Sequence, residues 1–497
     1  MDANYLVTGR IYSFDTGAAP FSHMLVQDGK VAVLSREPLP LSVPRLGLQE
    51  ATLVPAFVDS HVHLLELGLL LIMPDLSRAV KLADVFDALS AARGLAGELG
   101  FLMAFNVEPG NLRERRMPLC SELDSVIPSQ PLLVYRIDGH SASLNTRGLR
   151  MVFDQSVPEG VEQDVLCKPT GLLTSAVYEQ ASRAFKRLLP RDVKLSAFDR
   201  AAARADQQGV LTIGAFVGSD EPGDDIPELL QGCSARLPIC VVIYAQTLSI
   251  RRAQTMGLSR IGGCILVDGS FGSHTAALTE DYSDLPGCRG RLYFNDAELC
   301  RFLGEADAAG LQTAVHAIGD RAVSQVIGCY EQILTNNPLR HRVEHAELLD
   351  AGLMSRISRL GIVLGVQPAF EHFWGGPGRM YEQRLGSRFR STNPYRQLAD
   401  LNVTLAGGSD APITPVHAAL GISSAINHPV TEHRLTPLEA CRMFTDRAAF
   451  ALGCDARKGS LTPGHDADFL VLDSSPIDNL GFRVTRRFRL GREVSQP

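Results

Sequence analysis

Short apolar runs of strand length alternate with longer segments of helical periodicity through most of this chain. Parallel strands that are joined by crossover helices produce such an alternation. The pattern therefore favours an α/β fold, either a barrel or an open sheet. Eight candidate strands follow one another along the sequence: Thr52–Asp59, Val210–Phe216, Ile239–Ala245, Cys264–Asp268, Leu311–His316, His341–His345, Ile362–Gln367 and Val403–Gly408.

The long stretch between the first two candidate strands departs from this alternation. It contains further strand-like pieces at Phe101–Val107 and Leu132–Ile137, which indicate an insertion at about residues 70–205. Segments that follow barrel strands commonly lie over the mouth of an active site. We therefore expect the insertion to cover the functional site.

The two ends of the chain share a different character, because their short β-prone runs are separated by polar turns. These runs are Tyr5–Asp15, Met24–Leu34, Ala467–Leu472 and Val484–Val494. They predict a small composite domain, a β-sandwich that is built from residues 1–51 and 455–497. Barrels and small β units commonly occur as separate parts of chains of this length.

The last long helix of the body has clear boundary signals. Thr436 and Glu439 form a capping box around Pro437 in the first helical turn, and Gly453 follows the apolar run as a stop. We therefore predict one helix here and place the barrel at residues 52–454.

Charge and composition narrow the class of partner. The 497 residues include 48 basic and 55 acidic side chains, with a net charge of −7 and no long block of either sign. Binding to nucleic acid or to an anionic membrane would favour a basic patch. The apolar stretch Leu64–Met73 is also too short to span a bilayer. We expect a small-molecule substrate, with no nucleic-acid partner and no membrane association.

The N-terminus lacks a basic start followed by an apolar run, so no export signal is predicted. The ten cysteines show no C-x-x-C pair, and scattered cysteines of this kind are typical of reduced intracellular thiols. Both observations predict a cytoplasmic protein. The cysteines are Cys120, Cys167, Cys233, Cys240, Cys264, Cys288, Cys300, Cys329, Cys441 and Cys454.

Candidate chemistry begins at the end of the first predicted strand. His61 and His63 are two residues apart on an extended run, so their imidazoles point to the same side. This spacing suits chelation of one metal ion. A histidine pair of this kind is also compatible with hydrogen bonding in a core or on a surface.

Polar residues also close three other apolar strands, namely His316, His345 and Asp410. Barrel active sites lie at the C-terminal strand ends. Histidines with a carboxylate leave an open position as catalytic zinc requires, and a carboxylate can accept a proton from the activated water. Taken singly, each histidine is compatible with a hydrogen-bonded core position, and Asp410 with a helix N-cap before Pro412.

The ordered set of motifs resembles the amidohydrolase superfamily and, more narrowly, its YtcJ-like branch. The resemblance covers nearly the full chain, and the combination is far more specific than any single motif. It rests on Pro55–His63, Asp138–Ser141, Val267–Ser270, His316–Asp320, Arg342–Ala346, Gly408–Asp410 and Gly464–Phe469.

The resemblance implies a (β/α)8 barrel of the TIM type, a β-sandwich from both termini and a hydrolase that cleaves a C–N bond with metal-activated water. The bond would belong to an amide, a formamide, a cyclic amide or a related group. Asp410 would also act as the general acid and base. One Zn2+ ion, with two as the alternative count, or another divalent metal would be the cofactor, and relatives often form homodimers. The implied ligands are His61, His63, His316, His345 and Asp410.

Two positions depart from the family pattern. Cys264 stands where many relatives carry a carbamylated lysine that bridges two metals, and it is either a thiolate ligand or a buried inert side chain. His274 stands where relatives often have arginine. This replacement would remove a fixed positive charge near the substrate, so it affects the class of substrate that the site accepts. We assign His140, His274 and Gln367 as candidate substrate-binding residues, and Trp374 as either an aromatic lid or part of a packed loop.

Two other function classes remain compatible with these residues. An isomerase or lyase on the same barrel would use the metal as a Lewis acid only. The missing lysine instead motivates a non-catalytic, degenerate barrel. Because the other expected ligands and the proton acceptor are all present, hydrolysis is the interpretation that the residues favour.

Overall fold

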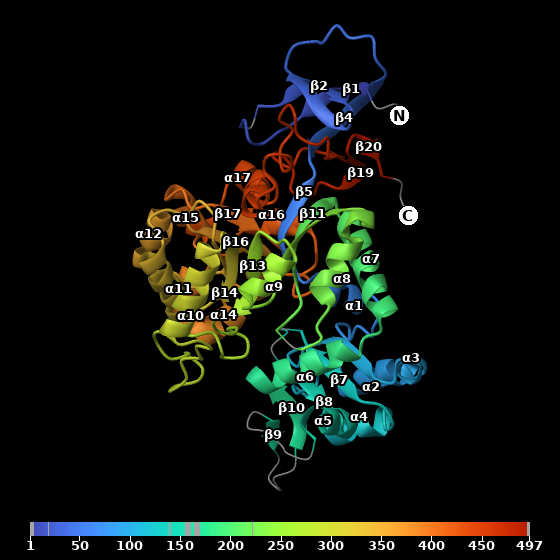
Figure 1. Ribbon diagram of the computed structural model, residues 1–497, viewed down its shortest axis with the longest axis vertical. Helices are drawn as coiled ribbons and strands as arrows, with labels where there is room; N and C mark the ends of the chain where they lie inside the picture. Colours follow the sequence, from blue (N-terminus) through green and yellow to red (C-terminus); the bar gives the residue numbers. More distant parts are fainter. Residues whose placement is uncertain are drawn as a thin grey trace.

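The computed structural model describes residues 4–17, 19–137, 139, 141–154, 161–163, 169–220 and 222–494. In this part of the chain the strands form three sheets of eight, seven and five strands. Figure 1 shows the seven-stranded sheet at one end of the molecule, the eight-stranded sheet in the middle and the five-stranded sheet at the other end.

The eight-stranded sheet is an almost closed barrel. Its strands are β5 (Phe57–Val62), β11 (Val210–Val217), β12 (Cys240–Ala245), β13 (Arg260–Leu266), β14 (Gln312–Ala317), β15 (Arg342–His345), β16 (Val363–Val366) and β17 (Leu405–Gly407). They follow the order β17-β16-β15-β14-β13-β12-β11-β5, and neighbouring strands are parallel. Next to the gap between β17 and β5, a parallel bridge joins Val62 and Ala411. The predicted barrel is confirmed.

The apolar runs in the sequence reflect the burial of these strands. Every residue of β5, β11, β14 and β15 is buried. Parallel strands are covered on both faces, so their sequences are nearly continuous in apolar residues rather than alternating. The eight candidate strands all overlap observed barrel strands, but the first has the wrong extent.

The predicted strand Thr52–Asp59 is divided between two sheets. Its first half belongs to β4 (Arg45–Pro55), which pairs with strands of the terminal sheet, whereas β5 begins at Phe57 and pairs with β11. A continuous apolar run does not reveal which partners its two halves pair with. The chain therefore passes directly from one sheet into the other at Ala56.

The seven-stranded sheet combines both ends of the chain. Its strands are β1 (Asn4–Ile11), β2 (Phe21–Gln27), β3 (Lys30–Ser35), β4, β18 (Phe469–Leu472), β19 (Val484–Arg489) and β20 (Arg492–Glu493). The order is β20-β19-β18-β4-β1-β2-β3, so the pairing of β18 with β4 joins the two ends. The sandwich arrangement of these strands stays a prediction.

The segment between β5 and β11 contains the five-stranded sheet. Its strands are β6 (Leu102–Val107), β7 (Leu132–Arg136), β8 (Ser141–Leu144), β9 (Val161–Gln163) and β10 (Pro169–Thr174), in the order β6-β7-β8-β10-β9. Figure 1 shows this sheet and its helices at the end of the barrel opposite the terminal sheet. An insertion after the first barrel strand is therefore present.

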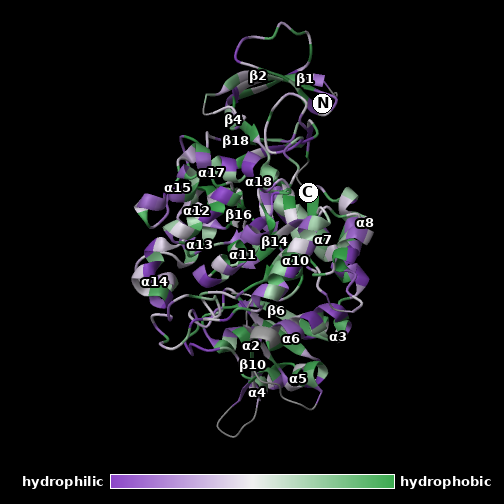
Figure 2. Ribbon diagram, turned by 60° about the vertical axis from the view of Figure 1, so that its left-hand side comes forward, coloured by the Kyte–Doolittle hydropathy of each residue, from purple (hydrophilic) through white to green (hydrophobic). Residues whose placement is uncertain are grey.

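The helices surround the barrel and the inserted sheet, and Figure 2 shows that most of them carry both hydrophilic and hydrophobic residues. This mixture is expected where one face of each helix packs on a sheet. The helices are α1 (Leu64–Leu70), α2 (Leu82–Ala91), α3 (Arg93–Leu99), α4 (Cys120–Val126), α5 (Thr146–Phe153), α6 (Ser175–Leu188), α7 (Arg191–Gln207), α8 (Ile226–Cys233), α9 (Ile250–Thr255), α10 (Asp296–Ala308), α11 (Asp320–Ile333), α12 (Ala351–Leu360), α13 (Pro368–Trp374), α14 (Met380–Leu385), α15 (Tyr395–Asp400), α16 (Ala418–Ile426), α17 (Pro437–Met443) and α18 (Asp446–Ala451). Within the described ranges, none of them is both long enough and apolar enough to cross a membrane.

The prediction of one long helix before Gly453 is wrong. The capping box at Thr436 and Glu439 is present, but α17 ends at Met443 and α18 starts at Asp446. The Thr445 hydroxyl donates to the Cys441 carbonyl oxygen at 2.9 Å, and the Thr445 backbone leaves the helical region. Hydroxyl side chains compete for backbone partners in this way.

The expectation that all ten cysteines are free thiols is also wrong. Cys300 on α10 and Cys329 on α11 form a disulfide across the two neighbouring helices. The two residues are 29 positions apart in the sequence. Only the packing of α10 against α11 brings them together, so spacing along the chain contained no signal for this pair.

Helix α1, which directly follows His63, packs very closely on α7. A Cβ atom at Gly68 would lie 2.0 Å from the carbonyl oxygen of Ala197, so Gly68→Ala forces the two helices apart. We expect this substitution to lower the free energy of unfolding by about 1–3 kcal/mol, as overpacking does. Urea denaturation measures it. The matched control is Gly94→Ala on α3, where an added Cβ meets nothing within 4 Å; a loss of equal size there would contradict the explanation.

Candidate active site

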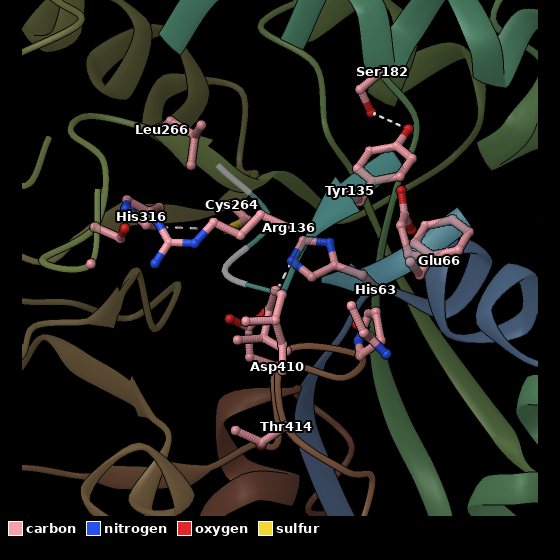
Figure 3. Close-up of a pocket in the computed structure, with 18 of the residues that line it drawn as sticks. His63, Glu66, Tyr135, Arg136, Ser182, Cys264, Leu266, His316, Asp410 and Thr414 are labelled. Carbon is pink, nitrogen blue, oxygen red and sulfur yellow. Dashed lines mark hydrogen bonds and ion pairs between the residues drawn. The ribbon is translucent and has the colours of Figure 1, made fainter. Parts of the chain in front are cut away.

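A cavity of about 1690 Å³ lies between the C-terminal ends of the barrel strands and the inserted segment. This is larger than the usual pocket for a small ligand. Figure 3 shows Tyr135, Arg136 and Ser182 of the inserted segment near residues of the barrel, including His63 and Asp410. Residues of the inserted segment therefore form one wall of the cavity.

His61, His63 and Asp410 form the first cluster of candidate metal ligands. Asp410 Oδ1 lies 3.1 Å from the Nε2 atom of each histidine, and the two Nε2 atoms are 3.4 Å apart. His61 is fully buried, whereas His63 and Asp410 line the cavity. The backbone bond from Asp410 N to His61 O, at 2.8 Å, holds the loop after β17 against β5.

Cys264 lies between this cluster and two further histidines. Its Sγ is 3.8 Å from His316 Nδ1 and 4.0 Å from His345 Nε2. His61, Cys264 and His345 also form a group whose ligand atoms all lie within 4.8 Å of one another. The structure thus brings all six predicted metal-binding residues to one place.

The spacing of the first cluster fits a divalent metal. Two ligand atoms at about 2.1 Å from a tetrahedral ion are about 3.4 Å apart, close to the observed separations. Asp410 Oδ1 is buried, and in the described structure it receives no hydrogen bond besides its two contacts with His61 and His63. Donation from His61 Nδ1 to Glu344 at 2.7 Å directs Nε2 toward Asp410. Two imidazole nitrogens and a carboxylate therefore converge on one buried point, which favours a cation there.

The charges of His63, Cys264 and Asp410 are set by their close packing against one another. Burial opposes charge on His63, but the hydrogen bonds and charges of Asp410 and Cys264 outweigh burial and raise the pKa of His63 to about 10. Burial also opposes ionisation of the Cys264 thiol, but the surrounding imidazoles hold its pKa well below the usual value. His61 and His63 likewise outweigh burial at Asp410 and hold its pKa well below the usual range. Cys264 and Asp410 are therefore anionic at neutral pH.

Three of the candidate ligands have backbones in the left-handed region. The φ angles are +65° at Cys264, +71° at His345 and +54° at Asp410. This region is uncommon for residues other than glycine, costs about 1–3 kcal/mol each and persists where function or packing requires it. The strain places these side chains toward a common centre, which supports a functional role for the cluster.

Each buried histidine is oriented by a second hydrogen bond. His61 donates to Glu344, which Arg342 also binds through Nε at 2.6 Å, and His345 Nδ1 donates to Gln367 Oε1 at 2.7 Å. His316 Nε2 donates to the carbonyl oxygen of Gly269 at 3.1 Å. Such partners select the tautomer and direct the other ring nitrogen toward a metal.

The fully buried Arg342 and Glu344 were not predicted as part of the site. The available signal was their spacing, because two oppositely charged residues two positions apart on an apolar strand face the same side. Among the residues of the insertion, Tyr135, Arg136 and Lys186 also line the cavity and were not predicted. Their positions depend on how the inserted sheet docks, which no local pattern records.

The candidate substrate-binding residues have different positions. Gln367 is buried behind His345 and outside the lining of the cavity, as its bond to His345 requires. His274 Nε2 lies 3.0 Å from Asp284 Oδ1, and His274 is not among the lining residues. His140 lies outside the described residues. Trp374 is half-buried at the end of α13 and lines the cavity.

Glu344→Gln tests the orienting role of the carboxylate. We expect metal affinity to fall about 10- to 100-fold, since a neutral amide is a weaker acceptor for His61. Competition with a chelator measures the affinity, and thermal unfolding is recorded in parallel. The control is Glu331→Gln, which changes a carboxylate paired with Arg356 and Arg359 on the barrel helices. Equal affinities in the two variants would refute this role.

A barrel with histidine, cysteine and aspartate side chains gathered at its C-terminal strand ends defines the class of metal-dependent barrel enzymes. A family model described as "Amidohydrolase family" matches residues 47–490. Because this match covers most of the sequence, the chain belongs to the amidohydrolase family, whose members are metal-dependent hydrolases.

Individual relatives agree with this assignment. The putative amidohydrolase YtcJ of Bacillus subtilis is 29% identical over 87% of this chain and 86% of its own length. The N-substituted formamide deformylase of Arthrobacter pascens is 24% identical over 95% of this chain and 94% of its own length. The crystal structure of an uncharacterized metal-dependent hydrolase from Pyrococcus horikoshii OT3 superimposes with a TM-score of 0.78, at 24% identity, over 99% of this chain and 100% of that one. That structural similarity concerns the fold.

Proposed function

We propose that this protein hydrolyses a C–N bond of a small molecule, such as an amide, a formamide, a cyclic amide or a related group, with Asp410 as general acid and base. The observation that carries the proposal is the position of Asp410 Oδ1, 3.1 Å from two imidazole nitrogens at the cavity wall. A proton acceptor and a candidate metal site are thereby in one place. The formamide deformylase among the relatives, named for a reaction at such a bond, supports this bond class.

His61, His63 and Asp410 would hold a first ion, and His316 and His345 a second one. Cys264 would be shared by both, because its sulfur lies among all four imidazoles. Nitrogen, thiolate and carboxylate donors together suit zinc. A bound ion would polarise the substrate carbonyl and lower the pKa of a water molecule.

Side chains of the protein would transfer the proton of the attacking water to the leaving group. Asp410 is ionised at neutral pH, so it can accept a proton from the attacking water and then donate it to the leaving nitrogen. Glu344 and Gln367 would keep His61 and His345 in the required orientation. The wall formed by the inserted segment would limit the access of bulk water to the bond.

Hydrolysis in isotopically labelled water separates this function from an isomerase or a lyase. The metal-loaded protein would be incubated with a panel of amides, formamides, cyclic amides and esters, and products would be analysed by mass spectrometry. We expect one labelled oxygen in the carboxylate product at each turnover of a C–N substrate. Turnover without incorporation of label would contradict hydrolysis, and turnover restricted to esters would contradict the proposed bond class.

A further inference from the structure

A continuous series of aromatic rings runs from the candidate metal ligands along α13. The ring of Phe370 stacks on His345 with centroids 6.0 Å apart and an interplanar angle of 9°. Trp374 meets Phe370 edge-on at 5.0 Å, and Phe373 lies 5.9 Å from Trp374. All three α13 residues line the cavity. The series therefore connects the reacting centre with the outer part of the cavity wall.

Exposure increases along this series. Phe370 is 6% exposed and Trp374 is half-buried, whereas Phe373 is 43% exposed. Burying such a ring is worth about 1.5–3 kcal/mol, and Phe373 keeps much of its surface open while it lines the cavity. This open apolar surface lies beside the one tryptophan of the chain.

A second aromatic pair lines the same cavity from the inserted segment. Phe105 and Tyr135 stack with centroids 4.7 Å apart and an interplanar angle of 2°. The Tyr135 hydroxyl is 3.0 Å from the Ser182 hydroxyl, which holds the ring in place. Apolar rings thus contribute to the cavity wall from the barrel as well as from the insertion. Aromatic faces in a cavity wall favour ligands that bring rings of their own, because such rings stack offset or edge-to-face.

We propose that the substrate carries an aryl group separated by a short linker from the bond that is cleaved, and that this group binds along α13 against Phe373 and Trp374. The proposal rests on the proposed hydrolase function, because it takes the metal cluster as the place of the reacting bond. The stack of Phe370 on His345 orients the series toward that bond. Phe373 and Trp374 then act as specificity residues that contact the substrate away from the reacting atoms.

The single tryptophan makes this binding site directly observable. Trp374 is the only tryptophan of the chain, so its fluorescence reports on the proposed site alone. The metal-loaded protein would be titrated with benzylacetone and with butanone, two ketones that differ by a phenyl group and contain no hydrolysable bond. We expect a saturable change in fluorescence with benzylacetone and no saturation with butanone over the same concentrations. Saturation at equal concentrations of both ketones would overturn the proposal.

Phe373→Ala is the informative variant, because this side chain is exposed and its loss leaves the core intact. We expect it to weaken binding of benzylacetone about fivefold, as the loss of one aromatic contact does. Leu401→Ala removes an exposed apolar side chain that does not line the cavity, and it should bind like the unmodified protein. Unchanged affinity in Phe373→Ala would refute the site. Metal content and turnover are measured separately, so failure of the hydrolase proposal is distinguishable from failure of aryl binding.

Discussion

Replacing Asp410 with asparagine is expected to lower kcat by about two to four orders of magnitude, the usual contribution of a positioned acid and base. Asparagine has nearly the same shape as aspartate, but its amide cannot accept the proton of the attacking water. The side chain lies in the cavity wall, 3.1 Å from the imidazoles of His61 and His63. Steady-state kinetics on any substrate identified in the panel measure this effect.

Two controls separate chemistry from folding in this experiment. Thermal unfolding of Asp410→Asn is recorded in parallel, because loss of the carboxylate beside His61 and His63 also removes a favourable charge interaction. Asp478→Asn changes an exposed carboxylate that pairs with Arg10, far along the chain from the cavity, and should leave kcat unchanged. Activity of Asp410→Asn within about tenfold of the unmodified protein would remove the acid and base role.

The double variant His61→Ala/His63→Ala is expected to lose its bound metal, because it removes two of the three candidate ligands in the cluster of His61, His63 and Asp410. Elemental analysis of protein purified without added metal measures the ions per chain. We expect about two equivalents of zinc in the unmodified protein, since structural and catalytic zinc are each held by three or four ligands and Cys264 completes both sets. The double variant should also lose catalysis.

Cys264→Ser decides whether the thiolate is shared. If Cys264 is a ligand of both ions, the serine variant should retain one equivalent fewer than the unmodified protein, because a hydroxyl is a much poorer zinc ligand than a thiolate. The control is Cys441→Ser, at a buried thiol whose pKa is raised by burial alone and which lies in α17. One equivalent in both the unmodified protein and Cys264→Ser would exclude a shared cysteine. No metal after reconstitution would overturn the hydrolase proposal itself.

The barrel strands and the positions of the candidate ligands were predictable from local sequence patterns. Apolar runs locate strands because parallel strands are buried on both faces, and His61, His316 and His345 stand at or near the C-terminal ends of β5, β14 and β15. The carboxyl ends of parallel strands lie on the same side of a barrel. The gathering of these side chains was therefore predictable without knowledge of any distance.

Local sequence patterns did not predict which distant segments pair with one another. The run Thr52–Asp59 is divided because β4 pairs with β18 near the end of the chain, while β5 pairs with β11. The Cys300–Cys329 disulfide likewise depends on the packing of α10 against α11. Hydrophobic periodicity reports burial, and it does not report which partner provides that burial.

By itself the sequence determined the class of fold, the resemblance to the amidohydrolases and the identity of the candidate ligands, since residue types and their order along the strands are sufficient for these. The tertiary structure decided how the ligands are used. It placed Cys264 among four imidazoles, moved Gln367 from the substrate side to a position behind His345, and brought the aromatic residues of α13 into the wall of the same cavity as residues of the inserted segment. These arrangements depend on contacts between segments far apart in the chain, and such contacts form only when the whole barrel packs.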